Sequence, residues 1–144
     1  MFFKSLLLIF ILIMATSKGL CARSLYIIAP KSIPSAAINL SNITRIYLGS
    51  SSYIASKVVM PAIYCENTDK LEMIVEKGLN IKLDKYQSNW RRKLFSGSAI
   101  PPQKLKDQTE FEQFLDSHEN SLIITFDKLD SNLEHNVIEI NVDG

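Results

Sequence analysis

The sequence predicts a single three-layer α/β domain in which a mixed sheet is flanked by helices. Short apolar runs typical of strands alternate along the chain with segments whose apolar residues recur at helical spacing. The 144-residue length suits one domain around one hydrophobic core once an N-terminal apolar segment is set aside. No internal repeat or low-complexity linker divides the chain.

The first 22 residues have the pattern of a signal peptide. A short basic start at Lys4 precedes an apolar run over residues 5–15, which is too short to span a bilayer comfortably. We therefore expect export and cleavage near Ala22, with residues 23–144 forming the domain. A retained N-terminal anchor is the alternative.

Charge and cysteine usage narrow the classes of partner and of chemistry. Without Lys4 and Lys18, the 16 Lys and Arg of the chain fall to 14, against 15 Asp and Glu. This balance predicts no general attraction to nucleic acid. Cleavage also removes Cys21, so the remaining Cys65 has no intramolecular partner for a disulfide. We expect Cys65 to be a buried, unreactive thiol, because no His lies near it in sequence.

Strands are expected where short runs of apolar residues lie between turn-forming residues. The first run is bounded by Pro30, and the last alternates apolar and polar residues. Pro61 lies inside the second run, which predicts an edge strand or an irregular one. The four expected strands are residues 24–29, 58–64, 122–126 and 137–142.

Helices are expected between these strands. Ser41 is the predicted N-cap of the first helix, and Gly49 is expected to end it in the left-handed conformation. Thr68 opens the second helix, which is expected to close at Gly78.

The third helix is expected over residues 83–95, where Leu83, Tyr86, Trp90 and Leu94 recur at helical spacing and indicate core packing. A fourth helix is expected to begin at a capping box formed by Thr109 and Glu112.

Two blocks of sequence carry a resemblance to a known family. Residues 43–49 read ITRIYLG and residues 90–102 read WRRKLFSGSAIPP. In order and spacing they resemble the small, single-domain members of the phosphate-binding-protein family, relatives of the periplasmic component of phosphate ABC transporters. The matching positions are Tyr47, Leu48, Gly49, Trp90, Arg92, Phe95, Gly97, Pro101 and Pro102.

The resemblance implies a fold like one lobe of a periplasmic binding protein, a periplasmic location, and phosphate or a similar oxyanion as ligand. The chain departs from the family after the second strand, where Ile63, Tyr64 and Cys65 replace an Asp followed by polar residues. The segment 121–125, which reads SLIIT, likewise replaces a run that contains glycine in the family.

The predicted ligand residues lie in two loops and one helix end. Ser96, Gly97 and Ser98 form a turn whose hydroxyls and backbone amides suit an oxyanion, although a plain helix-ending turn is the alternative. Arg92 matches a family Arg, and a guanidinium pairs with a tetrahedral oxyanion through two hydrogen bonds. Its alternative is a structural role at the helix end.

A second loop, residues 31–35, follows the first expected strand. The resemblance implies that Ser32 and Ser35 contact the anion there, and a solvated loop is the alternative.

The function expected from the sequence is binding without catalysis. His118 and His135 stand outside any metal or nucleophile motif, and no cofactor or metal is expected. The first hypothesis is binding of a small oxyanion. The second is a module that binds no anion and docks a membrane sensor or transporter.

Overall fold

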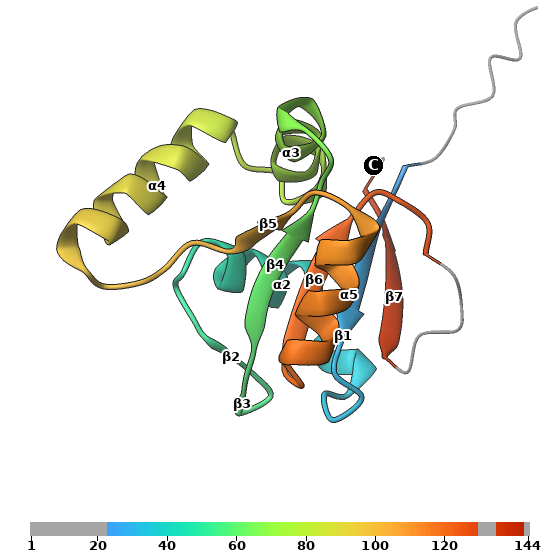
Figure 1. The fold of residues 1–144 in the computed structure, drawn as a ribbon. Coiled ribbons are helices and arrows are strands. Elements are labelled where there is room, and N and C mark those ends of the chain that lie inside the picture. The colour runs from blue at the N-terminus through green and yellow to red at the C-terminus, as the bar shows by residue number, and fades with distance from the viewer. Residues whose placement is uncertain (1–22, 130–134, 143–144) are drawn as a thin grey trace, which may run out of the picture.

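Five strands form one mixed sheet in the computed structural model, which describes residues 23–129 and 135–142 (Figure 1). The signal peptide predicted at residues 1–22 lies outside the described residues. The strands are β1 Ser24–Ala29, β4 Met60–Tyr64, β5 Gln103–Leu105, β6 Ser121–Thr125 and β7 Asn136–Asn141, and a separate small hairpin contains β2 Tyr53–Ile54 and β3 Lys57–Val58. The order across the sheet is β5-β4-β6-β1-β7. β4 is parallel to β5 and β6, whereas β1 is antiparallel to β6 and β7.

Helices cover both faces of this sheet, which confirms the predicted three-layer α/β domain. The helical segments are η2 Ser35–Ala37, α2 Leu40–Tyr47, α3 Thr68–Met73, the π-helical turn η3 Ile74–Gly78, α4 Leu83–Ser96 and α5 Gln108–Ser117. Buried side chains of α2, α3, η3 and α4 pack on one face, and those of α5 pack on the other. Figure 1 shows α5 in front of the sheet and α2 behind it.

The central strand β6 contributes to both layers of the core. Leu122 and Ile124 belong to the cluster shared with α2, α3 and α4, whereas Ile123 belongs to the cluster under α5. Successive side chains of a strand point to opposite faces, so a strand covered on both sides needs a continuous apolar run. This requirement explains why residues 122–124 read as a strand in the sequence.

Of the two alternatives predicted for the strand that contains Pro61, an edge strand or an irregular one, the edge strand is wrong, because β4 lies between β5 and β6. The amide of Met60 donates to Asn120 O on the β6 side (2.8 Å), so the nitrogen of the next residue, Pro61, faces the other way. The ladder with β5 begins only opposite Ala62. The missing N–H of Pro61 therefore costs no ladder hydrogen bond, because β5 has not yet begun at this position.

The N-cap of helix α2 lies two residues earlier than predicted. The side chain of Asn39, and not Ser41, accepts the amide of Asn42 (2.9 Å). The expected end is confirmed, since Gly49 follows the helix with a φ of +70°. Ile43, Ile46 and Tyr47 are the buried residues of this helix.

The predicted capping box of α5 is also displaced, by two residues. Asp107 accepts the amide of Glu110 (2.8 Å), and the Glu110 carboxylate accepts the amide of Lys106 (2.8 Å). The pair Thr109 and Glu112 does not form the box, because both residues lie inside the first turns of the helix.

Helix α4 extends away from the sheet beyond β5 (Figure 1). Tyr86 and Trp90 are buried and Leu83 packs at the margin of the core. The prediction that Leu94 joins them is wrong, since Leu94 is 53% exposed. One turn beyond Trp90 the helix has passed the part of the domain on which it packs.

Candidate functional site

The Ser96-Gly97-Ser98 turn is the C-terminal cap of α4. Gly97 has a φ of +67°, its amide donates to Leu94 O (3.1 Å), and the amide of Ser98 donates to Lys93 O (3.0 Å). The hydroxyl of Ser96 also donates to Lys93 O (3.1 Å). These donors satisfy the last carbonyls of the helix, whose C-terminal end carries a partial negative charge. An oxyanion at this turn would therefore find its donors already bonded to helix carbonyls, and it would be repelled by the partial negative charge at the end of the helix.

Arg92 lies on the exposed surface of α4, one turn before this cap. Its guanidinium donates to Oδ1 of Asn89 on the same helix (3.3 Å). Arg92 and the cap thus lie near each other because both belong to the last turns of α4.

Ser32 and Ser35 lie elsewhere, in the exposed segment that follows β1. Asn136 of β7 holds this segment through a hydrogen bond from Nδ2 to Ile33 O (3.2 Å). Because β6 and β4 stand between β1 and β5, the segment is about 14 Å from the β5 edge at about 4.8 Å per strand. The six predicted ligand residues are consequently divided between two places, and the oxyanion site stays a prediction.

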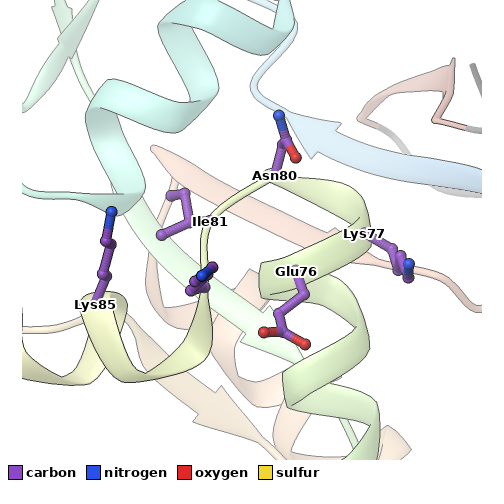
Figure 2. Close-up of a pocket in the computed structure, with 6 residues that line it drawn as sticks. Glu76, Lys77, Asn80, Ile81 and Lys85 are labelled. Carbon is purple, nitrogen blue, oxygen red and sulfur yellow. The ribbon is translucent and has the colours of Figure 1, made fainter.

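A hollow rich in lysine lies where η3 turns into α4 (Figure 2). It measures about 520 Å³ and is lined by Lys77, Lys82 and Lys85, together with Glu76. Figure 2 shows the side chains of Lys77 and Lys85 extending away from each other. The cations therefore do not converge on one ligand position.

An apolar groove of about 350 Å³ runs beside α4, between the helix and the segment that leads to β5. We call it the α4 groove. Its apolar wall consists of Tyr86, Trp90 and Leu94 from the helix and Pro101 and Pro102 from the segment. Burial raises the pKa of Tyr86, so its phenol stays neutral. Arg91 and Lys104 add the cationic part of the lining.

The helix side of the α4 groove is fixed to the end of α2. The indole Nε1 of Trp90 donates to Tyr47 O (3.0 Å), and the side chain of Asn89 donates to Leu48 O (2.9 Å). Lys93 adds a bond from Nζ to Gly49 O (3.3 Å), which places a cation at the C-terminal end of α2. The groove is therefore built on a rigid wall.

Three large apolar side chains are exposed at the α4 groove or next to it in the chain: Leu94 lines the groove, Phe95 follows Leu94, and Ile100 precedes the lining residue Pro101. Leu94 is 53% exposed, Phe95 is 94% exposed and Ile100 is 85% exposed. We call them the α4 tip. Sequence reasoning missed this role for all three, although one signal was available. Phe95 follows Leu94 directly, and neighbouring helical residues point about 100° apart, so both cannot share the stripe that contains Trp90.

A third hollow, the β4–β5 crevice, lies outside the carboxyl ends of β4 and β5. It measures about 370 Å³, and its lining includes Cys65, Thr68, Lys104 and Lys106. α3 follows β4 on one face of the sheet and α5 follows β5 on the other. Ligands of open α/β sheets bind at such a change of face. Lys104 lines both the crevice and the α4 groove, so the two hollows adjoin.

Cys65 is expected to react slowly in the native protein. Burial raises the pKa of its thiol, and the neighbouring Lys104 and Lys70 offset this only in part. The thiolate fraction at neutral pH is therefore below that of a free cysteine. Iodoacetamide labelling followed by peptide mapping should show Cys65 modified at least about tenfold more slowly in the native than in the guanidinium-unfolded protein. Equal rates would contradict a buried, protonated thiol.

No known family profile matches the chain, and searches of curated proteins and of solved structures find no similar protein. Within residues 23–129 and 135–142, no helix is long and apolar enough to cross a membrane. In the same residues, no group of three or more His, Cys, Asp or Glu side chains is placed to hold a metal ion.

Proposed function

We propose that this domain is a non-catalytic binding module that docks a membrane-associated protein, such as a sensor or transporter, through α4 and the segment to β5. The observation that carries the proposal is the α4 tip beside the α4 groove. Single exposed apolar residues are ordinary on protein surfaces, but several together beside an apolar hollow mark interaction sites. Aromatic side chains such as Phe95 and Trp90 are enriched in such interfaces.

The arrangement of α4 supports docking by a large partner. The helix is anchored at Trp90 and Asn89, and its last turn extends beyond β5 (Figure 1). An anchored helix with an apolar end presents contact area without a large ordering cost. The pattern of residues 1–22 adds an exported, periplasmic setting to the proposal.

Binding of phosphate or a similar oxyanion is supported by the resemblance of two sequence blocks. The geometry supports it less, because Ser32 and Ser35 lie apart from Arg92 and the donors of the Ser96–Ser98 turn are engaged by α4. Partner docking is therefore the function that the structure supports best.

Site-specific photo-crosslinking in the native cell tests the proposal. Benzoylphenylalanine in place of Phe95 keeps an exposed aromatic side chain and is expected to crosslink one integral membrane protein, identified by mass spectrometry. The matched control places the same probe at Glu112, an exposed position on α5 across the sheet. Equal adducts from both positions, or none from position 95, would contradict docking at the α4 tip.

Alanine variants of the same residues supply the complementary measurement. Replacing Phe95 and Ile100 with alanine should change the free energy of unfolding by less than about 0.5 kcal/mol each, because both side chains are exposed. The pair of changes should abolish the crosslink from a probe at Leu94. If a crosslink of full strength persists, the apolar tip does not carry the docking.

A further inference from the structure

We infer that the α4 groove and the adjoining β4–β5 crevice take an extended, acidic segment of the partner polypeptide, whose carboxylates are held by Arg91, Lys104 and Lys106. This inference rests on the proposed docking function and names the chemistry of the docked segment. It follows from three observations: the charge of the groove lining, the state of the β5 edge, and the continuity of the groove with the β4–β5 crevice.

The α4 groove has a mainly apolar lining, and all the charged residues in that lining are positive. Arg91 and Lys104 are its two charged residues, and no Asp or Glu of the described chain lines it. The hydroxyl of Ser88 occupies a donor of Arg91 (3.3 Å), and a guanidinium offers five N–H donors. The wall formed by Trp90, Leu94 and the prolines would be complemented by apolar side chains. The complementary segment is therefore apolar and acidic together.

The edge of β5 limits how this segment is held. Leu105 O accepts the amide of Cys65 from the β4 side (2.9 Å), so the backbone groups of Lys104 face away from β4. Pro102 has no N–H, and the amide of Lys106 donates to Glu110. The edge thus offers the backbone pair of one residue, which is too little for a long added strand. Side-chain contacts must supply most of the affinity and the selectivity for acidic residues.

The β4–β5 crevice adds a further cation, Lys106, beyond the α4 groove, and the one carboxylate of the described residues that lines it, Glu66, is paired with Lys70 (3.3 Å). Lys104 lines both hollows, and Lys106 lines the crevice. From Pro102 to Lys106 the backbone advances about 13 Å at about 3.3 Å per residue, so about four or five extended residues of a partner would span both hollows. Carboxylates on alternate residues would then meet Lys104 and Lys106 in turn.

Fluorescence anisotropy with two labelled peptides tests the inference on the full chain. One blocked octapeptide alternates leucine with glutamate, and the other alternates leucine with lysine. The glutamate peptide should bind at least about tenfold more tightly, and its affinity should fall as salt is raised, because exposed charge pairs are screened. Trp90 is the single tryptophan of the sequence and lines the groove, so its emission should change with the glutamate peptide only.

Charge reversal locates the peptide. Arg91→Glu and Lys104→Glu should each weaken binding of the glutamate peptide about tenfold, because each turns an attraction into a repulsion. The matched control, Lys85→Glu, makes the same change of net charge on α4 but outside the groove, and should stay within about twofold. Lys104→Gln provides a milder variant, and the melting temperature of each variant checks that it is folded.

The possible outcomes separate this inference from the proposed function. Equal affinity for the two peptides, or equal losses from Lys85→Glu and Lys104→Glu, would overturn the acidic segment while the crosslink at Phe95 still supports docking. If the probe at position 95 gives no crosslink but the protein still prefers the glutamate peptide, the proposal of a membrane-protein partner is overturned instead. Binding to phosphatidylglycerol vesicles that depends on Phe95 and Ile100, without peptide binding, would overturn both and identify the α4 tip as a lipid-binding surface.

Discussion

Replacing Trp90 with alanine is expected to lower the free energy of unfolding by about 3–5 kcal/mol. The side chain is only 5% exposed, and its ring packs against Gly49 and edge-on against Tyr86 (centroids 6.5 Å apart). Its removal leaves a cavity in the layer formed by α2 and α4. It also removes the indole donor of Tyr47 O.

Chemical denaturation monitored by circular dichroism measures this loss. Trp90→Phe keeps a ring and removes the indole N–H, so a smaller loss of about 1–2 kcal/mol is expected. Phe95→Ala is the exposed control, with a change within about 0.5 kcal/mol. A Trp90→Ala protein that melts within a few degrees of the native protein would show that the ring does not hold α4 to α2.

The loss at Trp90 bears directly on the proposed docking surface. Trp90 is buried on its α2 side and also lines the α4 groove. Weakening its packing should let α4 move and should weaken partner binding along with stability. The exposed residues Phe95 and Ile100 separate the two effects, since their replacement should affect binding alone.

Much of the fold was predictable because burial leaves a simple periodic signal. The run at residues 24–29 becomes β1 with the expected bounds, and the helical spacing of Tyr86 and Trp90 is borne out by their burial. The strand β5 was missed because only Leu105 of its three residues is buried. So short a segment carries no period that could reveal a strand.

The errors at Pro61 and at the helix caps have a common cause. Local sequence shows that a proline lacks an N–H, but the position of β5 relative to Pro61 is a tertiary fact. Similarly, Asn39 and Ser41 both suit an N-cap, and a shift of two residues separates them. Such choices depend on how the whole helix packs.

The site was less predictable than the fold for a related reason. The sequence around Gly97 indicates hydrogen-bond donors, but only the structure shows that these donors bond to carbonyls of α4. Conversely, Leu94 was expected in the core because its spacing continues the stripe of Trp90. Helix α4 continues past the end of α2, so Leu94 lacks a packing partner there. The sequence of α4 alone does not show where α2 ends.

Replacing Gly49 with alanine is expected to destabilise the domain by about 2–5 kcal/mol. Gly49 has a φ of +70°, where a side chain costs about 1–2 kcal/mol. A Cβ there would also lie 2.7 Å from Cη2 of Trp90, and overpacking of this kind costs about 1–3 kcal/mol. The indole cannot withdraw without losing its bond to Tyr47 O.

Gly97→Ala is the matched control, because Gly97 has a φ of +67° but no heavy atom within 4 Å of the added Cβ. It should show the conformational cost alone, about 1–2 kcal/mol, so the difference between the two variants measures the contact with Trp90. Combining Gly49→Ala with Trp90→Ala removes that contact, and the double variant should be more stable than the sum of the single losses implies. Equal losses for the two glycine variants, or strict additivity in the double variant, would mean that the end of α2 does not press against the indole. The α4 groove would then lack the rigid wall on which the proposed docking depends.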